Sequence, residues 1–187
     1  MMRKLTPLDG DILREHFIAL DDTSRRLRFC GPVNDRFLTS YCDRIDWLRT
    51  TIVGYFVDHV LRGVAELIVL KGYWPARAEL AISVQPGFQS RGIGGHLVDH
   101  ALAIARNRFI ARVEIVCLME NHRMRRLAER HGAALKTRLG EVKGRFPASW
   151  PNYLTLMEEA AAEGAAMFQA VLDLPQALTP GFWKQAG

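Results

Sequence analysis

A basic, glycine-rich turn at residues 85–95 restricts the choice of fold more than any other part of this sequence. It reads Gln-Pro-Gly-Phe-Gln-Ser-Arg-Gly-Ile-Gly-Gly and lies between a strand-like run at 78–84 and a helix-like run at 94–106. Because glycine has no Cβ, the backbone of such a turn can adopt positive φ and approach an anion closely. The helix that follows adds unpaired N–H groups and the positive end of its dipole. The sequence therefore predicts a pyrophosphate-binding loop between a strand and a helix.

Two widespread phosphate-binding patterns do not fit this turn. A P-loop needs Lys followed by Ser or Thr after its last glycine, where this chain has Gly95-His96. The dinucleotide fingerprint needs G-x-G-x-x-G, which the residues at 92–97, Gly-Ile-Gly-Gly-His-Leu, do not supply. The alternative interpretation is a turn that serves only to join the strand to the helix.

The turn does match the pattern Gln89-x-x-Gly92-x-Gly94, preceded by Ala-Glu-Leu-Ala-Ile-Ser-Val-Gln-Pro at 78–86 and followed by Asn121. In these motifs the chain resembles the GNAT family of acyl-CoA-dependent N-acyltransferases. The resemblance implies that acetyl-CoA is the cosubstrate. It also implies these cofactor-binding residues: Ile82, Val84, Gln89, Ser90, Arg91, Gly92, Ile93, Gly94, Gly95 and Asn121.

Hydrophobic periodicity predicts an α+β fold with antiparallel strands first and a βαβ crossover later. Strands are expected at 3–8, 51–60, 63–70, 77–84, 111–118 and 133–139, and helices at 12–20, 35–44, 94–106 and 121–131. This order is also that of the GNAT fold, a mixed, mostly antiparallel sheet with flanking helices. We expect a catalytic, acyl-CoA-binding domain at 1–150 and a C-terminal helical extension at 151–187. The extra helix either caps the core of the domain or forms a homodimer contact.

Composition excludes several classes of protein. The net charge of +5 suits an anionic cofactor but falls short of a nucleic-acid-binding face, and the basic run at 123–130 is interpreted as a solvated helix face. Cys30, Cys42 and Cys117 match no zinc or CxxC spacing, and the histidines are scattered, so no metal site is expected. No apolar run reaches the ~20 residues needed to span a bilayer, and no signal peptide is apparent. We expect a cytoplasmic protein.

Acyl transfer to an amine needs a general base, because an amine with a pKa near ~10.4 arrives protonated. Glu79 is the first candidate, since partial burial on a central strand would strengthen its carboxylate as a base. Its surroundings, Ala-Glu-Leu-Ala, resemble those of a glutamate in bacterial protein lysine acetyltransferases. A carboxylate paired with Arg77 is the alternative interpretation. Glu66, on the preceding strand, is the second candidate, and the two glutamates could share a proton if they lie close together.

Further roles are implied by the resemblance alone. The backbone N–H of Val84 is expected to polarise the thioester carbonyl, and Asn121 is expected to reach the pantetheine arm as well as cap a helix. Many family members have a tyrosine as general acid where this chain has Ala128, which leaves the identity of the acid open. The segment around Asn121 and the residues Leu20, Ser24-Arg25 and Arg28-Phe29 match the subset that contains the protein lysine acetyltransferases.

The resemblance implies transfer of an acetyl group from acetyl-CoA to a primary amine, with a protein lysine favoured over a small amine. The acceptor site is expected in the variable regions at 10–48 and 140–152, with Arg145, Phe146, Trp150 and Tyr153 as lining residues. The alternative is a non-catalytic module that binds acyl-CoA as a sensor.

Overall fold

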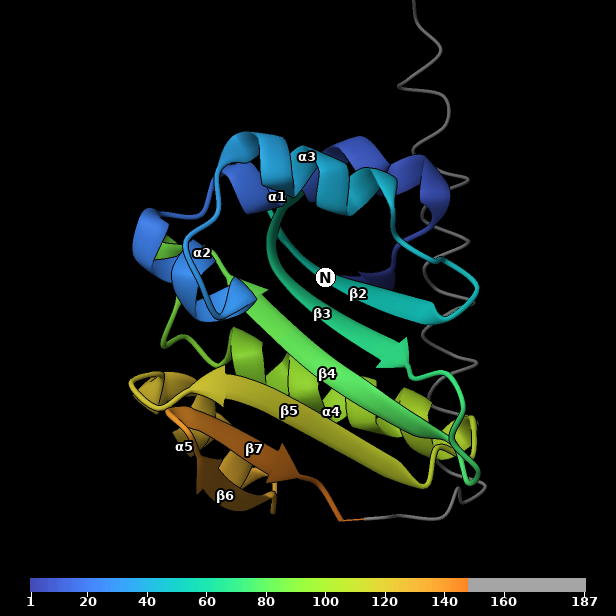
Figure 1. Ribbon diagram of the computed structural model, residues 1–187. Helices are drawn as coiled ribbons and strands as arrows, with labels where there is room; N and C mark the ends of the chain where they lie inside the picture. Colours follow the sequence, from blue (N-terminus) through green and yellow to red (C-terminus); the bar gives the residue numbers. More distant parts are fainter. Residues whose placement is uncertain (148–187) are drawn as a thin grey trace, which may run out of the picture.

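The computed structural model describes residues 1–147, which form a single seven-stranded sheet with helices on both faces (Figure 1). The strands are β1 (Met2–Lys4), β2 (Thr50–Val57), β3 (Val60–Val69), β4 (Arg77–Val84), β5 (Arg112–Leu118), β6 (Ala134–Arg138) and β7 (Glu141–Arg145). The helices are α1 (Gly10–Ile18), α2 (Asp22–Phe29), α3 (Asp35–Asp43), α4 (Ile93–Asn107) and α5 (His122–Arg130), with 3₁₀ turns at Pro7–Asp9 and Pro86–Phe88. The strand order across the sheet is β1-β2-β3-β4-β5-β7-β6.

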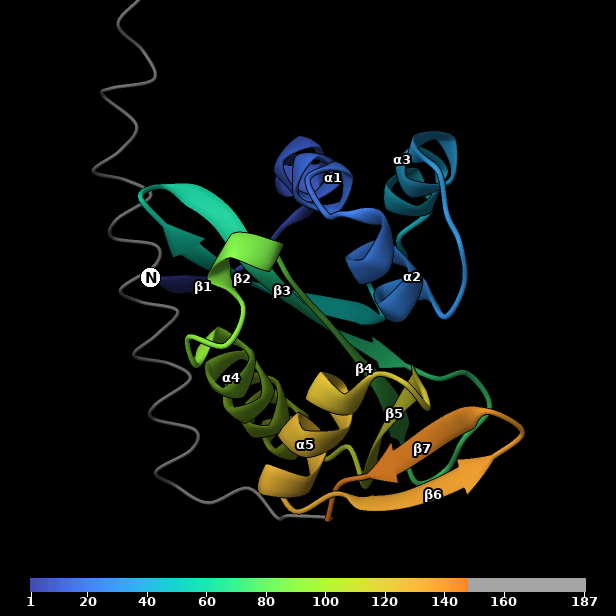
Figure 2. The ribbon, with the colours of Figure 1, turned by 90° about the vertical axis from the view of Figure 1, so that its left-hand side faces the viewer.

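Two hydrophobic cores lie on opposite faces of the sheet, because successive side chains of a strand point to opposite sides. Ile52 and Val64 pack under α1 and α3, whereas their neighbours Val53 and Ala65 pack against α4. Figures 1 and 2 show α1, α2 and α3 covering one face, and α4 and α5 covering the other. The side chains of β4 alternate in the same way, since Ala78 and Leu80 belong to the core beneath α4.

The central strands β4 and β5 separate at one end. They are parallel, and within the described residues they pair only from Arg77 with Arg112 to Glu79 with Glu114. Both strands continue, β4 to Val84 and β5 to Leu118. Beyond Glu79 a gap therefore opens between the carboxyl ends of two parallel strands, where ligands bind in sheets of this kind.

Most of the expected elements are present, but two were missed. Helix α2 is polar, with the sequence DTSRRLRF, so it lacks a clear apolar stripe; Asp21 starts it by accepting a hydrogen bond from the Ser24 N–H at 2.7 Å. Strand β7 follows a turn through Leu139 and Gly140, both at positive φ, and pairs with β5 and β6. The expectation of a variable loop was wrong for residues 141–145. The expected C-terminal helix lies outside the described residues.

Within residues 1–147, no helix is long and apolar enough to cross a membrane. The same residues contain no cluster of three or more His, Cys, Asp or Glu side chains that could hold a metal ion.

Candidate functional site

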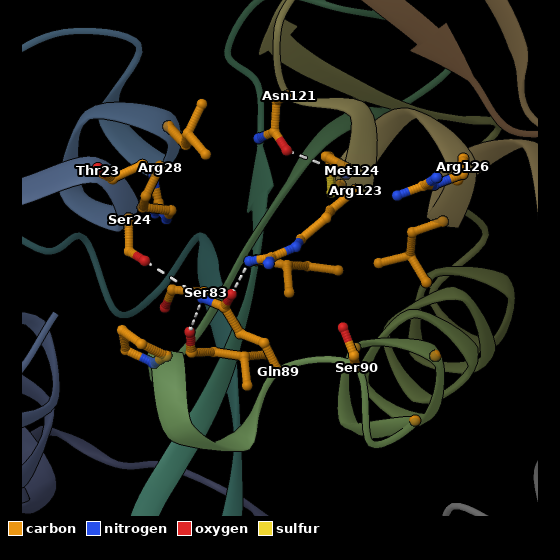
Figure 3. A pocket seen from close by; sticks show the side chains of 18 of the residues that line it. Thr23, Ser24, Arg28, Ser83, Gln89, Ser90, Asn121, Arg123, Met124 and Arg126 are labelled. Atoms are coloured by element: carbon orange, nitrogen blue, oxygen red, sulfur yellow. Dashed lines mark hydrogen bonds between the residues drawn. The ribbon is translucent and has the colours of Figure 1, made fainter. Parts of the chain in front are cut away.

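A pocket of about 790 Å³ lies at the open end of the gap between β4 and β5 (Figure 3). Its walls are the end of β4, the glycine-rich turn, the first turn of α4, and the two helices α2 and α5. The lining residues include Asp21, Thr23, Ser24, Leu27, Arg28, Ile82, Ser83, Val84, Gln89, Ser90, Gly92, Gly94, Gly95, Asn121, Arg123, Met124, Arg126 and Arg130. Most of the expected cofactor-binding residues are thus brought together here.

Every second residue of β4 points its backbone N–H and C=O groups into this gap. The Gln85 N–H donates to the Arg62 carbonyl at 2.9 Å, and the Arg77 carbonyl accepts from Leu70 N–H at 2.9 Å, so the odd-numbered residues of β4 bond to β3. In an antiparallel ladder the alternate residues then point their N–H and C=O groups to the other side. The N–H groups of Ile82 and Val84 therefore face the gap, in a position to stabilise negative charge on a ligand oxygen.

The turn before α4 has the geometry of an anion site. Gly92 immediately precedes the helix with φ of 83°, a conformation that side chains rarely adopt, and Ser90 has φ of 60°. A Cβ on Gly94 would lie 3.2 Å from a methyl group of Leu127, so a side chain here would crowd the contact between α4 and α5. The free N–H groups at the start of α4 thus open onto the pocket.

Helix α5 lines the opposite wall with cations. Arg123, Arg126 and Arg130 are exposed and line the pocket, so the solvated basic face expected from the sequence is also a wall of this site. Asn121 accepts a hydrogen bond from the Met124 N–H at 3.1 Å and caps the helix, as expected. The pocket therefore combines a helix N-terminus with three arginines, an arrangement that favours a phosphate-bearing ligand.

Gln89 ties three elements together at the pocket wall. Its amide nitrogen lies 2.9 Å from the Val84 carbonyl and 3.2 Å from Ser24 Oγ, and its amide oxygen accepts a hydrogen bond from Arg123 (Figure 3). The side chain thereby connects β4, α2 and α5. These contacts brace the pocket, and because Gln89 also lines it, the contact with the cofactor that the resemblance implies stays a prediction.

Glu79 lies at the apex of the gap, as the last β4 residue that pairs with β5. Its side chain is half-buried and is not part of the pocket lining. Ser83 is four positions further along the strand, which corresponds to roughly 13 Å. Glu79 and Ser83 lie on the same face of β4, because they are an even number of positions apart.

Glu66 is placed differently from the expectation of a second base. It is fully buried, with 0% of its surface exposed, and it forms an ion pair with Arg28 and accepts a hydrogen bond from Tyr41 Oη at 2.9 Å. Burial and the adjacent carboxylate raise the pKa of Tyr41. Across the strands Glu66 faces Ala81, not Glu79. The two glutamates are therefore diagonal neighbours, and the oxygens of Glu66 are committed to its own partners.

Two of the four expected acceptor residues, Arg145 and Phe146, lie within the described part of the chain, and neither lines the pocket. Phe146 is buried in the core beneath α4, and Arg145 lies 3.3 Å from the carboxylate of Glu114. Trp150 and Tyr153 lie outside the described residues. Ala128 is fully buried in the same core, so a tyrosine there would need a different local packing.

His16 and Ser83 were not identified from the sequence. His16 Nε2 lies 2.8 Å from Ser83 Oγ, and His16 Nδ1 lies 3.3 Å from the Leu61 carbonyl oxygen. Burial, together with the nearby positive charges of Arg28 and Arg62, lowers the pKa of His16 from 6.5 to about 4. No local signal reveals this pair, because a single histidine in an amphipathic helix is typical of many helices.

Comparison with known proteins places this geometry in context. The model of the acetyltransferase (GNAT) family matches residues 15–133. A search of curated proteins finds no significant match. Among solved structures, the fold is similar to the GNAT domain of PAT from S. lividans, with TM-score 0.68 and 23% identity over 78% of this chain and 88% of that one.

Two further structures share the fold. The PaiA N-acetyltransferase from Thermoplasma acidophilum, solved with coenzyme A, has TM-score 0.60 and 18% identity over 79% of this chain and 98% of that one. The ribosomal-protein-S18-alanine N-acetyltransferase from Escherichia coli has TM-score 0.61 and 17% identity, over 82% and 96%. At these identities the likeness concerns the fold.

Proposed function

The chain belongs to the acetyltransferase (GNAT) family, and on that premise we propose that it transfers an acetyl group from acetyl-CoA to a primary amine. The observation that carries the proposal is the gap between β4 and β5, which opens onto a glycine-rich helix N-terminus faced by arginines. A protein lysine is the favoured acceptor, supported by the motifs around Ser24, Glu79 and Asn121 and by the likeness to PAT from S. lividans.

The pocket residues fit acetyl-CoA. Gly92 and Gly94 leave room where side chains would strain the backbone or crowd Leu127, and the N–H groups at the start of α4 can receive a pyrophosphate. Arg123 and Arg126 neutralise the phosphates from the facing wall. When bound, acetyl-CoA supplies the activated acetyl thioester.

The residues of this chain would then act in sequence. Glu79 accepts a proton from the incoming ammonium, through water, because an unprotonated amine is the nucleophile. The Val84 N–H donates to the carbonyl oxygen as negative charge develops there. A carbon–nitrogen bond forms, the carbon–sulfur bond breaks, and the leaving sulfur takes up a proton from water or from the amine. Ala128 cannot provide this proton, which is why water or the amine is assigned the role.

The first test is cofactor binding, measured as a shift in the thermal unfolding transition. Acetyl-CoA should raise the melting temperature by mass action, and Gly92→Val should abolish the increase because a branched side chain is strained at positive φ and fills the anion site. Gly72→Val is the matched control, since Gly72 has φ of 76°, has open space around it, and lies outside the pocket. Equal loss of binding in both variants would show that backbone strain, and not the site, is responsible.

The second test is turnover. Release of free CoA should be measured with lysine-containing peptides and with small amines such as butylamine, in the presence of acetyl-CoA. Acceleration by any amine supports the enzyme, and a preference for peptides supports a protein lysine. Tight binding of acetyl-CoA with no acceleration by any acceptor would instead favour the sensor interpretation.

A further inference from the structure

The His16 and Ser83 pair links the core under α1 to the wall of the pocket. His16, from the last turn of α1, is only 1% exposed, and Ser83, near the end of β4, is 6% exposed and lines the pocket. The ring nitrogens of His16 contact two oxygens, the Leu61 carbonyl at 3.3 Å and Ser83 Oγ at 2.8 Å. Two elements 67 positions apart in the sequence thus meet in one buried hydrogen-bonded unit.

The partners of the ring determine which nitrogen carries the proton. A carbonyl oxygen can only accept, so the contact with Leu61 requires the proton of the neutral imidazole to be on Nδ1. Nε2 is then without a proton and accepts the hydrogen of the Ser83 hydroxyl. A hydroxyl has one hydrogen, so what Ser83 Oγ presents to any other group is its lone pairs. In this arrangement Ser83 is a hydrogen-bond acceptor toward the pocket.

The position of Ser83 on the strand indicates which part of a ligand it meets. The side chains of Ile82 and Val84 pack toward α4, whose N-terminus forms the anion site, whereas Ser83 points to the other face, toward α1. Ser24, Leu27 and other α2 residues line the pocket on that face. An amine that approaches the thioester from the side away from the phosphates passes along this wall.

We propose that Ser83 Oγ accepts a hydrogen bond from the N–H of the acceptor amine, and that His16 is a positioning residue which holds the hydroxyl in this orientation. This inference rests on the proposed acetyl transfer and assigns a specificity-determining residue within it. The amide product of a primary amine still has an N–H that can donate to Ser83 Oγ. The ester product of an alcohol has only lone pairs at the same position. The pair therefore favours nitrogen acceptors over oxygen acceptors.

The same two residues could be suspected of covalent catalysis, with Ser83 as nucleophile and His16 as base. The surroundings oppose this role. Removing the serine proton would create an imidazolium in a buried position, where its partner at Nδ1 is a neutral carbonyl and the nearby charges of Arg28 and Arg62 are positive. An imidazolium in such a site is unfavourable, so acyl transfer through Ser83 is an alternative to be excluded by experiment.

The test uses two conjugates of CoA that need no knowledge of the natural acceptor. In one, the sulfur carries CH₂–CO–NH–butyl; in the other, it carries CH₂–CO–O–butyl, which replaces the N–H by an oxygen. The wild-type protein should bind the amide about tenfold more tightly than the ester. The ester cannot form the hydrogen bond, and the lone pairs of its oxygen face the lone pairs of Ser83 Oγ. Equal affinities for the two conjugates would overturn the proposal without any variant being made.

Variants of His16 and Ser83 test whether this pair causes the preference for the amide conjugate over the ester conjugate. Ser83→Ala should reduce the amide-to-ester ratio to about one and leave the affinity for CoA itself unchanged within about twofold. His16→Phe should reduce the ratio because the hydroxyl hydrogen can then turn to the pocket, whereas His16→Gln, which can still accept, should retain it. Ser40→Ala, on α3 outside the pocket lining, is the matched control and should retain the full ratio.

Three other outcomes would contradict the proposal. A ratio that survives in Ser83→Ala would assign the preference to another group. A tenfold loss of CoA affinity in Ser83→Ala would mean that Ser83 contacts an amide of the pantetheine arm instead of the acceptor. A gain of one acetyl group in the intact mass after acetyl-CoA without amine, present in the wild-type protein and absent from Ser83→Ala, would show covalent catalysis. Failure of CoA to bind the wild-type protein would instead refute the proposed function itself.

Discussion

Acidification should destabilise this protein through one buried side chain, His16. Burial lowers its pKa in the folded protein from 6.5 to about 4. Between these values the unfolded chain binds a proton on the ring and the folded protein does not, so stability falls as the pH falls. The full difference amounts to about 3 kcal/mol of unfolding free energy, of which about 2 kcal/mol is lost by about pH 5. That is a large share of the ~5–15 kcal/mol that stabilises an ordinary domain.

The assay is urea unfolding of the wild-type protein and of His16→Gln, at about pH 7.5 and about pH 5. Glutamine can accept the Ser83 hydrogen but does not titrate, so the variant keeps the other acid-sensitive groups and loses only the contribution of His16. The free energy of the wild-type protein should fall by about 2 kcal/mol more than that of the variant over this interval. An equal fall in both proteins would refute the conclusion that the ring is buried in the neutral form.

Three further predictions concern other residues of the site and its support. Glu79→Gln should lower kcat by ~10²–10⁴-fold with unchanged affinity for acetyl-CoA, as measured by CoA release and calorimetry, and an unchanged kcat would exclude Glu79 as the base. Glu66→Gln should lower the free energy of unfolding in urea by about 3–5 kcal/mol, because Arg28 keeps a buried charge without its partner. The double variant Glu66→Leu with Arg28→Met should recover most of this loss. Unchanged stability of Glu66→Gln would contradict this expectation. Asn121→Ala should cost ~1 kcal/mol through loss of the α5 cap, and no change in the melting temperature would argue against the cap.

The sequence alone determined those features that depend on neighbouring residues. The anion-binding turn could be predicted because positive φ at Gly92 and a helix start at Ile93 follow from local chemistry. The alternation along β4 was visible because a strand places every second residue on one face. The apolar stripe of α4 was visible because a helix places every third and fourth residue on one face. Short or polar elements such as α2 and β7 gave no comparable signal, because their stability comes from packing against neighbours distant in the chain.

Only the tertiary structure decided which polar side chains meet. Glu66 resembled a catalytic carboxylate in the sequence, but folding brings Arg28, 38 positions away, against it and commits its charge. His16 and Ser83 are 67 positions apart, and nothing near either residue predicts their contact. The gap beyond Glu79 likewise depends on where two strands cease to pair, which sheet twist and packing set and no short motif encodes. Contacts between remote segments depend on how the helices pack on the sheet. The sequence pattern therefore located the glycine-rich turn at 85–95, but not the contact between His16 and Ser83.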